Sequence, residues 1–438
     1  MPARKPSRTC LWLVLFTLPA SAETKILKNF TLIDGTGKAP LSNAAMIIDN
    51  GRIQWIGPVA QLRAPAGAET IAASGKFVMP GIINLHGHVG NVIDLTQDPK
   101  YFTRENVEKN LKTYASYGVT TVLSLGTDQD LIFKIRDEQH AGRPTYTRVY
   151  TAGGGFTIKG SVGGMPGVTF LPASVSEIPE DISSLAAKKA DIVKMWVDDN
   201  RGKAKKMPFE MAKAIIDNAH QHQLRVAAHV YYLADAKRLM EAGVDAFAHS
   251  IRDQPVDDAL IAGMKKHGTW QLAATLTREA STYIYAKPPP FLNDPFFTRS
   301  VSAKTLDTLK DPNYQKKMAA DPDLPHYPEM LAMAQKNLKR LVDAGVKYGF
   351  GTDTGPPGRF LGFFEQWEME LEAEAGLTPA QVIAGATKNG AEFLHAADLG
   401  TLERGKWADL IVLDKNPLEN IKNTRSIQAI YIAGNRIQ

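Results

Sequence analysis

Cysteine is almost absent from this sequence, since Cys10 is the single one among 438 residues. Because Cys10 lies in a segment that we expect to be removed, the remaining chain can form no disulfide within itself and no thiolate metal site. A metal ion bound by this protein would therefore be held by histidine, by carboxylate or by a less usual ligand.

A long apolar segment near the N-terminus is also missing. Residues 11–18 form an apolar run that is too short to cross a bilayer, with three basic residues before it and the small residues 20–22 after it. This layout is typical of a secretory signal peptide. We therefore predict that residues 1–22 are a signal peptide, that the mature protein is periplasmic or secreted, and that it has no stable membrane insertion.

A basic block that could bind nucleic acid is lacking as well. Residues 1–22 carry three of the 51 Lys and Arg and no acidic residue, which leaves 48 basic against 46 acidic side chains. This nearly neutral balance gives no reason to expect nucleic acid as a partner. The Gly-rich residues 153–167 lack the Gly-Lys-Ser/Thr ending of a phosphate-binding loop, so we expect them to border or close over a pocket instead.

The middle of the chain alternates between strand-like and helix-like segments, and no repeat of the solenoid kind is present. The clearest helix-like segments cover residues 104–118, 208–223, 232–243 and 255–268. Eight parallel strands separated in this way favour a (β/α)8 TIM barrel, with a doubly wound open sheet as the alternative. The predicted strands begin at Phe77, Val119, Thr147, Ala190, Leu224, Asp245, Thr269 and Val346.

Short β-strands and tight turns flank this middle part on both sides. Turns are predicted at Asp34-Gly35, at Asn50-Gly51 and at Gly434-Asn435. We expect residues 23–76 and 396–438 to form one small β-sandwich domain, and residues 77–395 to form the barrel.

Histidines and other chemically active side chains stand at the C-terminal ends of the predicted strands, where a barrel of this kind carries its chemistry. His86 and His88 are two residues apart, so both imidazoles can face the barrel axis. Four imidazoles and a carboxylate match the ligands that Zn²⁺ and similar metals prefer. The side chains in question are His86, His88, Lys194, His229, His249 and Asp353.

Six further histidines lie on predicted helices, at their ends or in a loop. We interpret them as surface or packing residues: His140, His220, His222, His267, His326 and His395.

The motifs PGIINLHGH, DIVKMW, AAHVY, AFAHS and GTDTG follow one another in this order. Together with the closing segment GTLERGKWADLIVLDKNPLENI they resemble the metal-dependent amidohydrolase superfamily, and more narrowly its imidazolonepropionase-like and prolidase-like (Xaa-Pro dipeptidase) branch. The resemblance covers nearly the whole chain after residue 22. It implies a binuclear centre of two divalent ions, with zinc as the expected metal. His86, His88 and Asp353 would hold one ion, and His229 and His249 the other.

Lys194 is the least usual member of this set. An ammonium buried beside metal ions would be repelled, but burial lowers the pKa of a lysine, and the neutral amine can take up CO2 to become a carbamate. In the family that this sequence resembles, the lysine at this position does so and bridges the two ions. The alternative is a salt-bridged or snorkelling lysine, and the apolar residues around Lys194 argue for a buried strand instead.

Three side chains are expected to act on the substrate. Asp353 would serve both as a ligand and as general base and then acid. Tyr231 would donate a hydrogen bond to the developing oxyanion, and Arg252 would bind a substrate carboxylate, with Arg278 and Arg359 as rivals for that role. Ordinary packing is the alternative for Tyr231, and surface salt bridges are the alternative for the arginines. The insert at residues 277–327 is expected to shape the substrate site.

These features predict an exported binuclear amidohydrolase that cleaves an amide bond of a small-molecule substrate by attack of a metal-bridging hydroxide. The expected substrate is an Xaa-Pro-like dipeptide or an N-acyl amino acid. Hydrolysis of a lactone, carbamate, urea or organophosphate at the same site stays open, as does a mononuclear deaminase, against which Lys194 counts. A binding protein without activity would be marked by a missing ligand, and all six are present. The sequence leaves the native metal and a homo-oligomer open.

Overall fold

A computed structural model describes residues 24–438 of the chain. The predicted signal peptide at residues 1–22 and Cys10 lie outside the described residues. None of the helices between residues 24 and 438 combines the length and the apolar character that crossing a bilayer requires.

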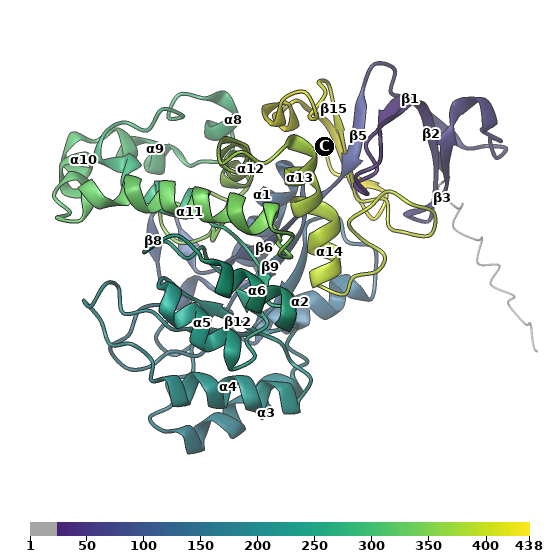
Figure 1. The fold of residues 1–438 in the computed structure, drawn as a ribbon. Helices are drawn as coiled ribbons and strands as arrows, with labels where there is room; N and C mark the ends of the chain where they lie inside the picture. Colours follow the sequence, from purple (N-terminus) through teal and green to yellow (C-terminus); the bar gives the residue numbers. More distant parts are fainter. Residues whose placement is uncertain (1–23) are drawn as a thin grey trace, which may run out of the picture.

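One eight-stranded sheet is built from both ends of the described chain (Figure 1). β5 pairs antiparallel with β15, which joins the two ends, and buried side chains such as Phe30, Ile53 and Tyr431 form its core. The predicted flanking strands therefore do combine in one sheet. Its strands are β1 (Lys25–Leu32), β2 (Leu41–Asp49), β3 (Arg52–Pro58), β4 (Glu69–Ala72), β5 (Phe77–Pro80), β15 (Leu410–Leu413), β16 (Ile427–Ile432) and β17 (Asn435–Arg436).

The central strands are parallel and follow one another in chain order. β6 (Ile82–Gly87), β9 (Val119–Ser124) and β10 (Arg148–Thr151) form one sheet. The second sheet contains β11 (Val193–Trp196), β12 (Val226–His229), β13 (Ala246–Phe247) and β14 (Trp270–Gln271). A doubly wound sheet would reverse its strand order at a switch point, and these strands do not, so the arrangement is barrel-like with an additional sheet.

Backbone contacts continue from one central sheet to the other. Phe156 bridges to Met195 in β11, Gln271 in β14 bridges to Tyr348, and Gly87 in β6 bridges to Thr354. The eighth predicted strand, from Val346, is present only as these isolated bridges and not as a regular strand. This segment still lies beside β6 from Phe350 to Thr354.

The single strand predicted from Phe77 is divided in two. β5 belongs to the terminal sheet and β6 to the central strands. Pro80 has no N–H to continue a ladder, and a Cβ at Gly81 would lie 2.2 Å from the side chain of Thr120. The chain therefore changes sheets at this point.

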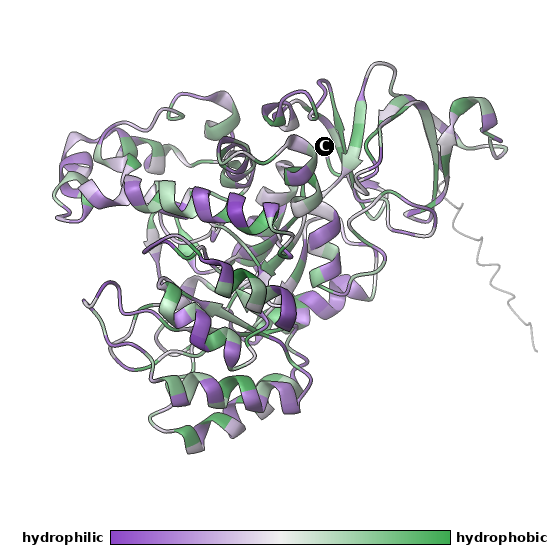
Figure 2. Cartoon of the chain, viewed as in Figure 1, coloured by the Kyte–Doolittle hydropathy of each residue, from purple (hydrophilic) through white to green (hydrophobic). Residues whose placement is uncertain are grey.

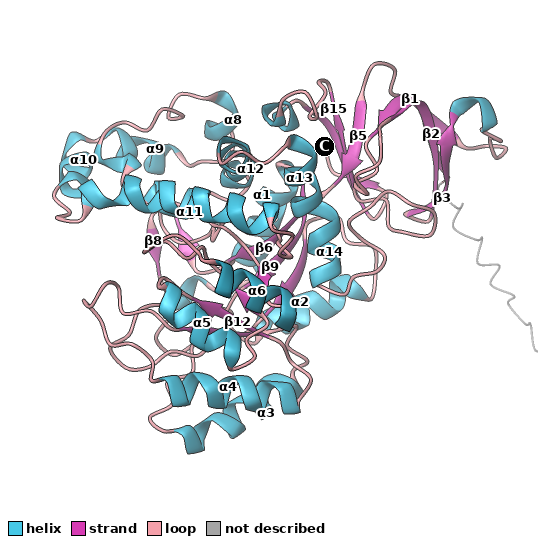
Figure 3. Ribbon diagram, viewed as in Figure 1, coloured by secondary structure: helices cyan, strands magenta, loops and turns pink. Residues whose placement is uncertain are grey.

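Helices cover the outside of the central strands, with polar residues facing solvent and apolar residues facing inward (Figures 2 and 3). In α1, Val107, Leu111 and Tyr114 are buried at helical spacing, and Thr103 caps the helix by accepting from the N–H of Asn106. The four helix-like segments expected from the sequence are α1, α4, α5 and α6, which the structure confirms. The helices are α1 (Arg104–Ser116), α2 (Leu131–His140), α3 (Ile178–Ala187), α4 (Phe209–Gln221), α5 (Leu233–Glu241), α6 (Asp258–His267), α7 (Leu276–Ser281), α8 (Pro295–Thr298), α9 (Ala303–Lys310), α10 (Pro312–Ala319), α11 (Tyr327–Asp343), α12 (Phe363–Glu374), α13 (Pro379–Ala384) and α14 (Gly390–Phe393).

Two irregular regions lie near the strand ends. The short hairpin of β7 (Val92–Ile93) and β8 (Thr96–Gln97) follows β6. The predicted insert at residues 277–327 contains α8, α9 and α10, which lie together at the upper left of Figure 1.

Candidate metal centre

Three predicted ligands come together at the end of β6. Among the described residues, His86, His88 and Asp353 form a group that could hold a metal ion, with one ligand atom of each lying within 4.8 Å of the others. The Nε2 atoms of His88 and His86 lie 2.8 Å and 3.5 Å from the same carboxylate oxygen, Oδ1 of Asp353. All three side chains are buried or nearly so.

The outer nitrogen of each of these rings is held by an oxygen. His86 Nδ1 lies 2.8 Å from the carbonyl oxygen of Ala248, which can only accept, so Nδ1 donates and Nε2 keeps a free lone pair. His88 Nδ1 lies 2.9 Å from the hydroxyl of Thr127. Such partners orient metal-binding imidazoles. Sequence reasoning missed Thr127, because its closeness to His88 depends on the packing of two separate loops.

The other two predicted histidine ligands lie beside this group. The ring centroids of His86 and His249 are 4.7 Å apart, and those of His249 and His229 are 4.1 Å apart. His249 Nδ1 contacts the hydroxyl of Thr275 at 2.9 Å. The structure therefore gathers all four imidazoles in one place.

Asp198 is a functional candidate that sequence reasoning missed. Its Oδ2 atom lies 2.9 Å from Nε2 of His229. Burial works against ionisation of Asp198, but the hydrogen bond with His229 and the charge of Arg252 hold the pKa of this carboxyl below its ordinary value. Its position, two residues after the end of β11, is the one signal in the sequence that could have identified it.

Burial keeps His86, His229 and His249 uncharged. It lowers the pKa of His229 to about 4 and holds the pKa values of His86 and His249 well below their ordinary value, and the charge of Lys194 acts in the same direction on all three. Neutral imidazole is the form that binds metal. The donor set therefore fits a divalent metal of the zinc type.

Lys194 lies in β11 and is fully buried. Within residues 24–438 its Nζ atom has no hydrogen-bond partner. Burial lowers the pKa of Lys194 to about 7, against the attraction of Asp353. A buried polar atom without a partner requires an explanation, and a carbamate that contacts metal ions would provide one.

Asp353 is held in a defined orientation by two arginines. Its Oδ2 atom lies 2.5 Å from Nη1 of Arg359 and 3.2 Å from Nε of Arg278. Although burial opposes ionisation, the positive charge of Arg359 and the histidines His86 and His88 keep the pKa of Asp353 well below its usual range. Its backbone is left-handed, with φ of 58°.

A cavity of about 260 Å³ lies at this site, and Lys194 itself is not part of its wall. Its wall includes Val162, Gly163 and Gly164, so the Gly-rich residues 153–167 border the pocket as the sequence predicted. None of the six other histidines of the described chain lies in this wall. The further lining side chains include the four imidazoles, Asp353, Asp198, Trp196, Arg278 and Arg359.

Tyr231 and Arg252, predicted to touch the substrate, line a different cavity of about 370 Å³. Arg252 is only 3% exposed, donates to the carbonyl oxygens of Val230 and Ser250, and pairs with Glu279 at 3.1 Å. Its guanidinium is thus occupied within the protein. Of the three arginines considered, Arg278 and Arg359 are the ones beside the metal ligands.

Comparison with known proteins places this geometry in context. The profile of the Amidohydrolase family matches residues 77–437. The chain is 24% identical to the imidazolonepropionase of Streptomyces avermitilis over 394 residues, covering 86% of this chain and 83% of that protein. It is 25% identical to the ochratoxinase of Aspergillus niger over 455 aligned positions, covering 93% of this chain and 85% of the relative.

Solved structures share the fold over most of the chain. A Xaa-Pro dipeptidase with bound methionine superimposes with a TM-score of 0.73 at 21% identity, covering 94% of this chain and 99% of that one. The ochratoxinase of A. niger gives a TM-score of 0.70 at 21% identity, covering 95% of this chain and 96% of that one.

Proposed function

Since this chain belongs to the Amidohydrolase family, we propose that it is an exported binuclear hydrolase that cleaves the amide bond of a dipeptide or an N-acyl amino acid. Membership makes the chain a metal-dependent hydrolase of carbon–nitrogen bonds. The number of metals, the substrate and the location are the new parts of this proposal. Its reaction centre would lie at the mouth of a closed (β/α)8 barrel.

One observation carries the binuclear part. The amine of Lys194 is fully buried, lacks a hydrogen-bond partner among residues 24–438 and has its pKa lowered to about 7. Such an amine is able to react with CO2. The carbamate formed in this way would supply an anionic bridge, which an imidazole does not.

The ligands divide into two sets around this lysine. His86, His88 and Asp353 would hold one ion, and His229 and His249 would hold the other. The carbamate of Lys194 would contact both ions. Two ions bound in this way would lower the pKa of a shared water and polarise the scissile carbonyl. Zinc is the metal that we propose, because imidazole and carboxylate ligands suit it.

Asp353 is suited to move the proton during the reaction. Its carboxylate is ionised and buried, and Arg359 and Arg278 fix its Oδ2 atom. It would accept a proton from the attacking water and return it to the leaving nitrogen. A fixed carboxylate needs no reorientation between these two transfers.

Arg278 and Arg359 also suit a substrate that carries a carboxylate. Both line the cavity of the candidate metal ligands. A guanidinium has five N–H donors, of which Asp353, and for Arg278 also Glu279, occupy only part. Dipeptides and N-acyl amino acids both have such a carboxylate close to the bond that is cleaved. The similarity to a Xaa-Pro dipeptidase agrees with this choice.

Hydrolysis of matched substrates tests the proposal. Mature protein loaded with zinc in bicarbonate buffer would be supplied with Xaa-Pro dipeptides, N-acetyl amino acids and the amides of the same compounds, which lack the carboxylate. We expect amine release from the carboxylates at a higher kcat/KM than from the amides, and a raised KM for the carboxylates in Arg278→Lys. Equal rates for both groups, or activity confined to lactones, ureas or phosphoesters, would overturn it.

A further inference from the structure

Thr275 is held in a backbone conformation that its residue type rarely adopts. Its φ of 53° and ψ of 43° lie in the left-handed region, where a β-branched residue is an outlier. Strain of this kind persists only where the surrounding structure imposes it, and it gathers at functional sites. The hydroxyl of Thr275 lies 2.9 Å from Nδ1 of His249, a proposed metal ligand.

Thr275 also stands directly before α7, where the cap of this helix is expected. A threonine at such a position commonly accepts from a backbone N–H of the first turn. In the described structure the hydroxyl of Thr275 makes no bond of this kind and contacts His249 instead. Because the start of α7 is buried, its N–H groups need another acceptor.

Glu368 of α12 supplies that acceptor. Its Oε1 atom accepts from the N–H of Leu276 at 2.6 Å. Its Oε2 atom accepts from the N–H of Thr277 at 2.7 Å and from the hydroxyl of the same residue at 2.6 Å. All three side chains are buried. A cap that comes from a separate helix leaves the hydroxyl of Thr275 available to His249.

The same helix holds the segment of Asp353, one turn earlier. Glu365 accepts from the hydroxyls of Thr352 and Thr354 at 2.7 Å and 2.6 Å. Asp353, which lies between these two threonines, is also left-handed, with φ of 58°. Residues three apart on a helix are neighbours on its surface. Glu365 and Glu368 therefore reach two strand-end segments from one side of α12.

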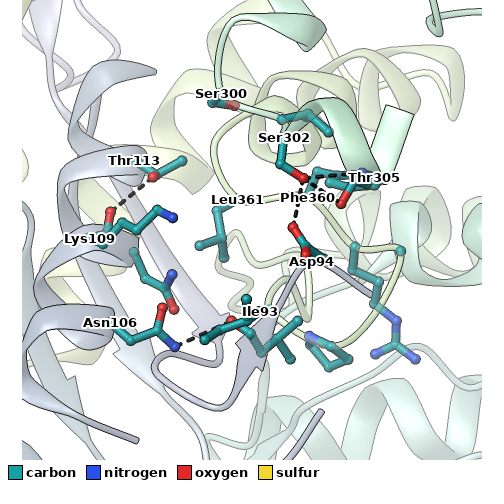
Figure 4. A pocket seen from close by; sticks show the side chains of 17 residues that line it. Ile93, Asp94, Asn106, Lys109, Thr113, Ser300, Ser302, Thr305, Phe360 and Leu361 are labelled. Atoms are coloured by element: carbon teal, nitrogen blue, oxygen red, sulfur yellow. Dashed lines mark hydrogen bonds between the residues drawn. The ribbon is translucent and has the colours of Figure 1, made fainter. Parts of the chain in front are cut away.

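The connection between Asp353 and α12 borders open space. It runs through residues 355–361, most of which line a cavity of about 140 Å³, and Figure 4 shows Phe360 and Leu361 at its wall. Direct hydrogen bonds from α12, and not this connection alone, hold the helix against the strand ends.

We propose that Glu368 is a positioning residue for His249, which acts by capping α7 and so keeps the hydroxyl of Thr275 on Nδ1 of the imidazole. Nε2 is then the nitrogen that is available to a metal. The inference rests on the proposed function only in taking His249 as a metal ligand. Without the carboxylate, Thr275 can turn to the N–H groups of α7, and His249 loses the partner that orients its ring.

Spectroscopy of the metal-free full chain tests the contact itself. Two-bond proton–nitrogen correlation spectra of isotope-labelled histidines report the tautomer of each ring. We expect one tautomer of His249 in the wild type and a mixture of both in Glu368→Gln and in Thr275→Ala. Thr275→Ser, which keeps the hydroxyl, should match the wild type. Glu365→Gln is the matched control, because it changes an equally buried glutamate of the same helix that makes no printed contact with α7.

Zinc affinity, measured against a competing chelator, tests the consequence. Glu368→Gln and Thr275→Ala should each weaken the ion held with His249 about 10- to 100-fold. The double variant should bind no more weakly than the weaker single variant, because both changes act through one hydroxyl. Additive losses would overturn the positioning role, as would a tautomer in Glu368→Gln that is the same as in the wild type.

The same experiments separate this inference from the proposed function. A protein that binds a single zinc ion, or that hydrolyses none of the carboxylate substrates, contradicts the proposed function. If its His249 still changes tautomer in Glu368→Gln, the positioning role is supported. Two zinc ions and full hydrolysis, together with an unchanged His249 in Glu368→Gln, contradict the positioning role alone.

Discussion

Nε2 of His229 and Oδ2 of Asp198 lie 2.9 Å apart in the described structure. Because an ionised carboxylate can only accept, Nε2 carries the hydrogen and Nδ1 keeps the lone pair. Asp198 thus selects the tautomer in which His229 would bind its metal through Nδ1. Under the proposed function, Asp198 would act on the metal through His229.

Removing this carboxylate should weaken one metal site more than the other. In Asp198→Ala, the affinity for the ion proposed to be held by His229 and His249 is expected to fall about 10- to 100-fold, as for other partners of metal-binding histidines. The ion proposed to be held by His86, His88 and Asp353 should stay bound. Titration with zinc against a competing chelator measures both affinities. Asp199→Ala is the control, because Asp199 contacts Tyr232 and Gly202 and no histidine. Unchanged affinities in Asp198→Ala would contradict the assignment.

Glu365 should stabilise the folded protein, because it holds the segment that carries Asp353 in place. Its Oε1 atom accepts from Asn84 and from the hydroxyls of Thr352 and Thr354, which flank Asp353. Its Oε2 atom accepts from the N–H of Gly362. A glutamine at this position has one acceptor oxygen and one NH2 group, so its NH2 group would face one of these sets of donors and could not accept from it.

We therefore expect Glu365→Gln to lower the free energy of unfolding by about 1–3 kcal/mol, the cost of a buried polar group without a partner. Urea denaturation measures this change. Glu374→Gln, at an exposed position of the same helix, should have almost no effect. A Glu365→Gln variant as stable as the wild type would show that the network does not need the carboxylate.

Asp128 should make the stability depend on pH. Burial raises its pKa to about 6, although its carboxylate accepts from Ser124 and Thr151. Between its unfolded pKa near 4 and its folded pKa near 6, the folded state binds more protons than the unfolded state. The contribution of Asp128 to stability is therefore full below pH 4 and is lost as the pH rises through 6.

Asp128→Asn removes this titration with little change of shape. The variant should match the wild type near pH 4 and be more stable by up to about 3 kcal/mol at pH 8, as about two pKa units imply. Urea denaturation across this range measures the difference. Asp130→Asn, at an exposed carboxylate, should follow the wild-type curve. A difference that is independent of pH would contradict this account.

The sequence predicts the grouping of the imidazoles better than it predicts the partners that orient them. His86, His88, His229 and His249 could be identified because each lies at or just after the end of a strand, where local pattern is informative. The oxygens that orient the imidazoles come from other loops, and their positions depend on tertiary packing. Pattern alone therefore could not identify Asp198.

The arginines show the same limit. Arg252 lies three residues after His249, so sequence distance favoured it over Arg278 and Arg359. Its guanidinium is instead held by Glu279 and two backbone carbonyls. The direction of a long side chain depends on the charges that surround it in space, and spacing along the chain does not report them.

The central claim is that Lys194 bridges two metal ions as a carbamate. The most direct measurement is the metal content per chain by plasma mass spectrometry, on protein prepared with zinc and bicarbonate, for the wild type, Lys194→Ala and the exposed-lysine control Lys213→Ala. The account predicts about two ions per chain in the wild type and the control, and a clear loss in Lys194→Ala. About one ion per chain in all three proteins would contradict the bridge and would favour a mononuclear hydrolase or deaminase.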